Sequence, residues 1–294
     1  MTRRGALLFA AMCVIWGIPY LLIRVAVRDL SPVTLVVART VIASALLLPL
    51  AAWRRELRIE RRHWPALLAF TAVEISLPWL LLAKAETRLT SSLTGLLIAG
   101  VPLVGAVVTT FTGERERHGG GRWAGLLVGL AGVAAIVGFD IHGTAVLPLV
   151  EIAGVATCYA IGPIILARWL HDAPSLGVVT VSIALAALAY LPFAAFSLPS
   201  SFPGWKVDAS VAGLAVACTA LAFVLFTQLV AEAGPVRATV ITYVNPAVAA
   251  VLGVTILDEK FTAGMAVGFA LVLAGSVLAT RPTPQRVVPQ LEAS

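Results

Sequence analysis

One apolar motif occurs twice in this chain, about half its length apart. Gly100-Val101-Pro102-Leu103-Val104 lies in an apolar run that ends near Glu114, and Val244-Asn245-Pro246-Ala247-Val248 lies in a second run that ends near Glu259. Each copy contains five apolar stretches of membrane length. Because five is an odd number, the second copy must enter a membrane from the side opposite to the first. The two copies therefore form an inverted repeat.

The apolar stretches have the length of membrane-spanning helices. They cover residues 6–27, 32–53, 65–86, 90–112, 121–140, 146–169, 175–198, 209–231, 236–257 and 262–280. At 1.5 Å per residue, about 20 residues cross a hydrocarbon core of about 30 Å. With 60% hydrophobic and 12% charged residues, the composition excludes an ordinary soluble domain. We predict an all-α polytopic membrane protein of ten helices in two inverted repeats, 1–142 and 143–281, with a disordered cytoplasmic tail over 282–294.

The basic residues predict the orientation. With the N-terminus inside, fourteen arginines fall on the cytoplasmic side, whereas six arginines and lysines fall on the other side. The fourteen are Arg3, Arg4, Arg54, Arg55, Arg58, Arg61, Arg62, Arg115, Arg117, Arg122, Arg168, Arg237, Arg281 and Arg286. The positive-inside rule then places both termini in the cytoplasm, in the plasma or inner membrane. The net charge of +6 reflects this bias, and we expect no nucleic-acid partner.

The chain shows no pattern for covalent catalysis or metal binding. Cys13, Cys158 and Cys218 fall inside apolar stretches at no metal-ligand spacing, and the histidines fall in predicted loops. The Gly-x-x-x-x-Gly-Lys-Ser/Thr sequence of a nucleotide-binding loop is absent. We therefore expect no cofactor and no enzymatic activity.

Several motifs together carry a resemblance to a known family. The first helix contains Trp16-Gly17-Ile18-Pro19-Tyr20, the fourth opens with Thr90-Ser91-Ser92, and the ninth contains Tyr243-Val244-Asn245-Pro246 before Asp258-Glu259. Over essentially its whole length the chain resembles the EamA family of the drug/metabolite transporter superfamily. The resemblance implies ten helices with both termini inside and a central cavity between the repeats. It also implies export of amino acids or other small metabolites.

The two copies differ in ways that predict an asymmetric cavity. Pro102 and Glu114 are twelve residues apart, whereas Pro246 and Glu259 are thirteen apart, the spacing usual in the family. The second copy has Cys158-Tyr159 where the first has Trp16-Gly17.

Intramembrane ionisable residues are candidate functional groups because a charge in lipid is costly. Glu74 lies about nine residues into the third span, and we expect it to face the interior, where it could carry a proton or meet a cationic group of the substrate. A structural carboxylate bonded to a neighbouring helix is the alternative. Glu151 lies nearer the outer surface and could reach water. Arg39 could snorkel, pair with Glu151 or hold a substrate carboxylate.

Uncharged polar and aromatic side chains are candidate cavity-lining residues. Trp16 and Tyr20 are predicted to share one face of the first helix, and the stripe of Thr239, Tyr243 and Pro246 to share one face of the ninth. Such groups suit an amphipathic ligand, although they also serve interhelical hydrogen bonding. The full set is Trp16, Tyr20, Thr90, Thr94, Tyr159, Gln228, Thr239, Tyr243 and Asn245, together with Glu74.

Pro102 and Pro246 are candidate hinges. A proline inside a helix removes a backbone donor, and the freed carbonyl must find another partner in the membrane. Kinks at paired positions could flex during alternating access. The glycines near 125–132 and 264–268 are predicted to serve close helix packing.

Three functions remain in competition at this point. The leading hypothesis is a secondary transporter, an exporter of small metabolites, whose partners are the bilayer, the substrate and, as one option, protons. A polytopic enzyme acting on a lipid would need clustered acids, bases or metal ligands, and no such cluster is visible. A water channel is disfavoured because Asn245-Pro246-Ala247 occurs once, within a full-length span. The substrate, the direction and the oligomeric state do not follow from the sequence.

Overall fold

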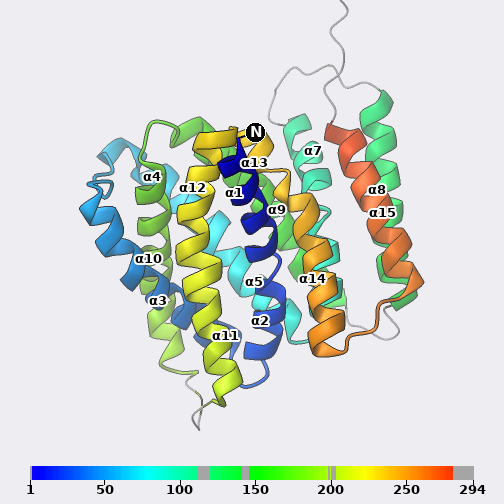
Figure 1. Ribbon diagram of the computed structural model, residues 1–294, viewed down its shortest axis with the longest axis horizontal. Helices are drawn as coiled ribbons and strands as arrows, with labels where there is room; N and C mark the ends of the chain where they lie inside the picture. The colour runs from blue at the N-terminus through cyan, green and yellow to red at the C-terminus, as the bar shows by residue number, and fades with distance from the viewer. Residues whose placement is uncertain (1, 112–119, 141–145, 198, 200–202, 281–294) are drawn as a thin grey trace, which may run out of the picture.

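The first repeat consists of helices that cross the bundle five times. The structure is a computed structural model, which describes residues 2–111, 120–140, 146–197, 199 and 203–280 (Figure 1). The elements of the first repeat are α1 (Arg3–Ile15), α2 (Pro19–Ala26), α3 (Pro32–Trp53), the 3-10 turn η1 (Arg61–His63), α4 (Trp64–Phe70), the π-helix η2 (Thr71–Ser76), α5 (Leu77–Glu86), α6 (Ser91–Ile98), α7 (Val101–Phe111) and α8 (Gly120–Asp140).

The second repeat follows the same plan. Its elements are α9 (Val146–Trp169), α10 (Ser175–Ala194), α11 (Trp205–Ala215), the π-helix η3 (Val216–Leu221), α12 (Ala222–Ala233), α13 (Pro235–Ala238), α14 (Ile241–Leu257) and α15 (Ala263–Thr280). Within the described residues, nine stretches are long and apolar enough to cross a membrane, and α13 with the shorter apolar α14 makes the tenth.

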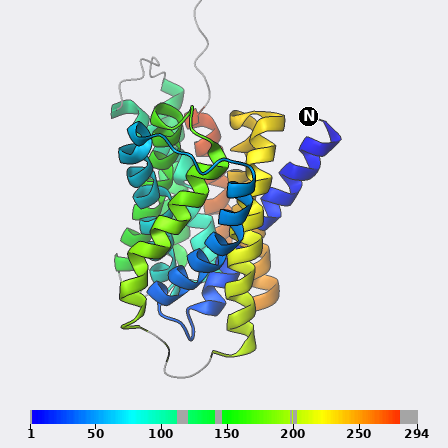
Figure 2. The same cartoon turned by 90° about the vertical axis from the view of Figure 1, so that its left-hand side faces the viewer.

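The predicted fold of ten helices in two five-helix repeats is confirmed. The bounds agree to within a few residues; the eighth span, for example, was expected over 209–231 and covers Trp205–Ala233. α1 begins at the end of the bundle marked N in Figure 1, and α9 begins at the opposite end. The side view in Figure 2 shows the helices running between the same two ends. The second repeat therefore crosses in the opposite sense to the first.

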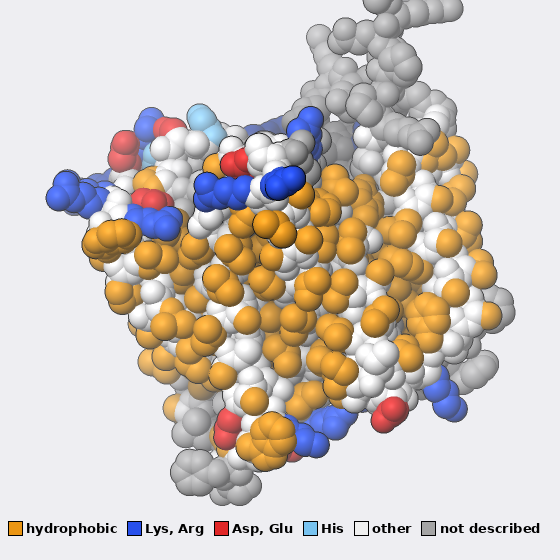
Figure 3. Space-filling model, viewed as in Figure 1, with side chains coloured by type: hydrophobic (Ala, Val, Ile, Leu, Met, Phe, Trp, Pro, Cys, Tyr) orange, Lys and Arg blue, Asp and Glu red, His pale blue; other side chains and the backbone are white. Residues whose placement is uncertain are grey.

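The surface has the polarity of a membrane protein. In Figure 3 hydrophobic side chains cover the middle of the visible face, and charged side chains gather at its two ends. Large apolar side chains such as Leu7, Leu127 and Leu188 are about two-thirds exposed. A soluble monomer rarely exposes so wide an apolar surface, which here suits lipid.

Glycines hold α8 against α15 at the edge of the bundle (Figure 1). A Cβ on Gly132 would lie 2.7 Å from the carbonyl oxygen of Gly268, and a Cβ on Gly275 would overlap the backbone of Gly129. The two backbones can approach only because both sides lack side chains, as in other small-residue interfaces of membrane helices. The predicted packing role of these glycines is confirmed.

The first span is interrupted in its middle. α1 ends at Ile15 and α2 begins at Pro19, and the amide of Gly17 bonds the carbonyl of Val14 at 2.9 Å instead of that of Cys13. Pro19 has no N–H to continue the helical ladder. The prediction of one continuous first helix is therefore wrong.

The third and eighth spans each contain one π-helical segment. η2 and η3 are six residues long and lie 145 positions apart (216 − 71), so the two repeats place them equivalently. A π-turn changes the facing of the side chains that follow it and often marks a functional site. Glu74 lies on η2, and Thr219 lies on η3.

Candidate functional site

Arg39 is buried at the junction of the two repeats. It lies on α3, its side chain is 7% exposed, and its Nε donates a 2.8 Å hydrogen bond to Oγ1 of Thr219 on η3. The guanidinium carbon lies 3.7 Å from the ring centroid of Trp79 on α5. A cation over an aromatic face gains electrostatic stabilisation, which increases when both groups are desolvated.

Glu74 lies on η2 and faces α9. A Cβ built on Gly162 of α9 would overlap the Glu74 carboxylate, so the absence of a side chain there makes room for it. Its Oε2 is buried and has no hydrogen-bond partner among the described residues. The carboxylate thus points toward a neighbouring helix of the other repeat, as its depth in the span predicts.

Tyr159 connects these two charged residues. It lies on α9 and interacts electrostatically with both Glu74 and Arg39. We call Arg39, Glu74, Trp79, Tyr159 and Thr219 the central cluster. Its members come from both repeats, which a site for alternating access requires.

Trp16 and Tyr20 contact different elements because the helix is interrupted between them. The Trp16 ring packs on Phe223 and Phe226 of α12, with centroids 5.8 and 4.7 Å away. Tyr20 is buried with its ring against Gly95 of α6, and it interacts electrostatically with Tyr159. Tyr20 therefore lies near the central cluster, and the expected shared face with Trp16 is wrong.

Asn245 joins the ninth span to the break in the first. With its amide oriented to donate, Nδ2 lies 2.9 Å from the carbonyl oxygens of Cys13 and Ile241. The Cys13 carbonyl is the one that Gly17 leaves without its helical partner. The side chain of Asn245, which is buried, thus satisfies a backbone group that the break exposes.

The remaining polar candidates lie away from the central cluster's contacts. Thr90 is the N-cap of α6, and the Oγ1 of Thr94 is buried without a hydrogen-bond partner in the described part of the chain. Gln228 accepts a 3.2 Å hydrogen bond from Arg4. Thr239 lies in the turn between α13 and α14, so it does not share a helix with the half-buried Tyr243, and the expected stripe is wrong.

Arg39 does not pair with Glu151, which was one of the roles considered for Arg39. Glu151 is buried, and its Oε2 lies 3.8 Å from Nη1 of Arg88, whereas Arg39 contacts Thr219 and Trp79. Glu151 thus has a cation of its own, Arg88, at the end of the bundle opposite the N-terminus.

The candidate hinges occupy different positions in their helices. Pro102 is the second residue of α7, directly after the interruption at Ala99 and Gly100. Pro246 lies inside α14, several residues beyond the interruption between α13 and α14.

A set of hydrogen bonds joins α6 to the residues after α14 at the end of the bundle opposite the N-terminus, and the sequence did not predict it. The Glu259 carboxylate accepts hydrogen bonds from the amides of Ser91 and Ser92, both at 2.8 Å, and from their hydroxyls at 3.1 and 2.6 Å. These serines form the first turn of α6, where free N–H groups attract an anion. Gly253 leaves room for them, since a Cβ there would overlap Ser92 and Glu259. We call this contact the outer clasp, because the distribution of arginines predicts that this end faces away from the cytoplasm.

Two inverted five-helix repeats around a buried polar cluster define a polytopic membrane protein of the transporter class. Residues 3–138 and 148–281 each match the EamA-like transporter family, and the chain belongs to that family. The resemblance seen in the sequence is thereby confirmed.

Related proteins agree with this assignment, and a solved structure shares the fold. An uncharacterized transporter of Archaeoglobus fulgidus is 26% identical over 95% of this chain and 98% of its own length. The uncharacterized transporter YvbV of Bacillus subtilis is 25% identical over 94% of this chain and 91% of its own. A crystal structure shares the fold with a TM-score of 0.68 at 20% identity, over 94% of this chain and 96% of the other.

Proposed function

We propose that the protein is a secondary transporter that exports small zwitterionic metabolites such as amino acids. The observation that carries the proposal is the pair of ionisable residues, Arg39 and Glu74, that both interact electrostatically with Tyr159. Among the described residues, neither has an oppositely charged group within 4.0 Å. An uncompensated charge in a low-dielectric interior is costly, so a ligand that brings both charges would be stabilised there.

The geometry favours a carboxylate at Arg39 and an ammonium group at Glu74. Arg39 presents a planar donor fork that suits a carboxylate, and the buried Glu74 Oε2 lacks a donor. Trp79 and Tyr159 add flat apolar surfaces with polar tips, which fit an amphipathic molecule. Glu74 could instead carry the coupling proton when no substrate is bound.

The asymmetry between the two ends of the bundle supports alternating access. At the outer end the clasp draws α6 against α14, and α2 packs on both. At the other end Arg4 bonds Gln228 and Arg62 pairs with Asp172, but among the described residues α7 and α14 are not in extensive contact there. We infer a conformation in which α7 and α14 are separated toward the end that carries the N-terminus. The distribution of arginines predicts that this end faces the cytoplasm.

The test is transport by purified protein in liposomes, with three ligands that share the same isobutyl group. Leucine carries both charges, 3-methylbutylamine only the positive one, and 4-methylpentanoate only the negative one. We expect saturable flux of a zwitterion such as leucine and none of the singly charged analogues. Saturable flux of either analogue at the same rate would contradict the two-charge site. Conversion of a lipid, with no flux, would instead favour the alternative of a membrane enzyme.

Substitutions then assign the two charges. Glu74→Gln and Arg39→Gln should each raise the half-saturation concentration by about tenfold or more, as expected for a lost charged hydrogen bond. Glu151→Gln is the matched control, because Glu151 is a buried carboxylate that pairs with Arg88. If Glu151→Gln lost transport while Glu74→Gln transported like the wild type, the carboxylate of the site would be Glu151 and not Glu74.

A further inference from the structure

A buried carboxyl group without a partner lies close to the outer clasp. Glu86 is the last residue of α5, and its side chain is fully buried. Neither of its carboxyl oxygens has a hydrogen-bond partner among the described residues, and no other carboxyl group in that part of the chain has both oxygens in this state. An ionised carboxylate in such a place would lose its hydration without compensation, which is costly.

The groups around Glu86 do not neutralise it. Arg24 of α2 donates a hydrogen bond from Nη1 to the backbone carbonyl of Glu86 and not to its carboxyl group. Within the described residues, no cation lies within 4.0 Å of the carboxyl oxygens. Arg24 attracts an ionised Glu86 from a greater distance, but Glu259 of the outer clasp repels it, and Tyr20 of α2 also lies within electrostatic reach. A protonated Glu86 avoids both the repulsion and the cost of burying a charge.

The other charged groups on the elements that pack against α5 have contacts of their own. These elements are α2, α3, α6, α9 and η2. Glu151 of α9 lies 3.8 Å from Arg88, Arg39 of α3 contacts Thr219 and Trp79, and Glu74 of η2 faces Gly162. Lys84, on α5 itself, is exposed. Glu86 is therefore left with Arg24, Glu259 and Tyr20.

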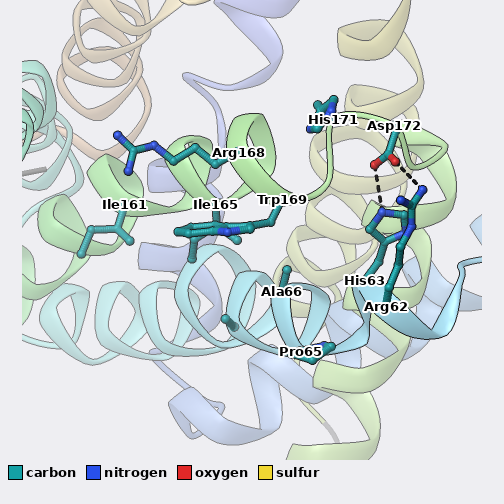
Figure 4. Close-up of a pocket in the computed structure, with 11 residues that line it drawn as sticks. Arg62, His63, Pro65, Ala66, Ile161, Ile165, Arg168, Trp169, His171 and Asp172 are labelled. Carbon is teal, nitrogen blue, oxygen red and sulfur yellow. Dashed lines mark hydrogen bonds and ion pairs between the residues drawn. The ribbon is translucent and has the colours of Figure 1, made fainter. Parts of the chain in front are cut away.

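A carboxylate at the opposite end of the bundle shows the arrangement that Glu86 lacks. Oδ2 of Asp172 lies 2.6 Å from Nη2 of Arg62, and Oδ1 lies 2.8 Å from Nε2 of His63 (Figure 4). Both oxygens of Asp172 thus meet basic groups, which compensate an ionised carboxylate.

We propose that Glu86 is a proton-binding site that controls the outer clasp. While the outer end is closed, Glu86 is protonated. When α6 separates from Glu259, water reaches the carboxyl group, and its O–H proton passes to that water. The closed end thus binds the proton more tightly than the open end, so a low external pH favours the closed end. This proposal rests on the alternating access proposed above but not on the identity of the substrate.

The size of the effect follows from the release of one proton on opening. A hydrated glutamate ionises near pH 4.3, that is, about the value that the open end should show. Above about this pH, the ratio of open to closed molecules should rise by up to about tenfold per pH unit, until the closed form also ionises.

The test is labelling of a buried cysteine from outside intact cells with a membrane-impermeant maleimide, at external pH values from about 5.5 to about 7.5. Thr94→Cys on α6, in a variant without the three native cysteines, is the reporter. With Glu86 intact, labelling should accelerate as the pH rises. Glu86→Gln keeps the uncharged form, so it should be labelled slowly at every pH. Both variants carry the same cysteine, and the ratio of their rates therefore cancels the pH dependence of the maleimide reaction.

A control and a second measurement separate Glu86 from other carboxyl groups. Glu151→Gln changes another buried carboxyl group at the same end and should keep the acceleration. In infrared spectra of the purified proteins, the difference between wild type and Glu86→Gln should contain the C=O stretching band of a protonated carboxylic acid.

The outcomes distinguish this proposal from alternating access itself. A rate ratio that stays constant with pH, or the absence of the infrared band, would overturn the proton site, while labelling in Glu259→Gln would leave alternating access standing. Faster labelling at low pH would point to protonation of Glu259 and would also overturn it. No labelling in any variant, Glu259→Gln included, would contradict alternating access and this proposal together.

Discussion

Breaking the outer clasp should open the outer end of the transporter. In Glu259→Gln, an amide replaces a carboxylate that accepts four hydrogen bonds from Ser91 and Ser92. Three of these bonds end on Oε2. If the amide nitrogen of Gln takes the place of Oε2, its N–H groups face the N–H and O–H donors of the serines, and those bonds are lost.

The size of the effect follows from the kind of bond that is lost. Hydrogen bonds to charged groups contribute about 1.5–3 kcal/mol each, and an anion at a helix N-terminus contributes up to about 2 kcal/mol. Since the remaining groups can relax, we expect the closed outer end to lose about 2–4 kcal/mol. That loss corresponds to a shift in the conformational equilibrium of roughly 30- to 1000-fold.

Labelling of a cysteine beneath the clasp measures this shift. Thr94 is fully buried one turn below Ser91, so Thr94→Cys, in a variant without the three native cysteines, reports opening. A membrane-impermeant maleimide added outside intact cells should label this cysteine much faster in Glu259→Gln than with Glu259 intact. Lys260→Gln, which removes a neighbouring exposed charge, should leave the rate unchanged. An unchanged rate in a folded Glu259→Gln variant would refute the reasoning.

Two further substitutions test the packing and the charged loop. Gly132→Leu should lower the thermal unfolding temperature in detergent, because overpacking costs about 1–3 kcal/mol. Gly138→Leu should not lower it, because a Cβ on Gly138 meets no atom within 4 Å. Equal effects of the two substitutions would contradict close packing of α8 on α15. Burial acts to raise the pKa of Asp172, but a backbone hydrogen bond and the charge of Arg62, with that of His63, outweigh it and place the pKa below its ordinary value. The folded state therefore binds this proton less tightly, so its stabilisation is present above about pH 4 and is lost as the pH falls through the folded pKa. Asp172→Asn should reduce the acid dependence of thermal unfolding, and an unchanged dependence would show that other carboxylates determine it.

The spans could be predicted because membrane insertion depends on apolar length, which the sequence displays directly. Their interruptions were harder to predict. Pro19 marks the break in the first span, but η2 and η3 contain no proline, and nothing in Thr71–Ser76 distinguishes a π-turn from an α-helix. Both segments pack on helices of the other repeat, η2 on α9 and α10 and η3 on α3, and such contacts are not visible in the local sequence.

The charged candidates could be predicted better than their partners. Arg39 and Glu74 stand out because ionisable residues are rare in apolar spans. Trp79 and Thr219 do not, since aromatic and hydroxyl residues are common there. The outer clasp depends on residues 167 and 168 positions apart in sequence, so no local pattern contains it. The one local signal was the pair Ser91-Ser92 at the start of a helix. Such a pair predicts that an acceptor binds there, but not which residue provides it.

The equivalent π-helices explain how a symmetric backbone can hold an asymmetric site. η2 and η3 occupy corresponding places in the two repeats, but η2 presents Glu74 toward α9, whereas η3 presents Thr219 toward Arg39. In the proposed mechanism, an inverted backbone supplies two equivalent ways of closing, one for each side of the membrane. If both repeats presented the same group, a zwitterion could bind in either of two opposite orientations. Because the charge falls on one π-helix and the neutral hydroxyl on the other, a zwitterion would keep one orientation while the two ends exchange access.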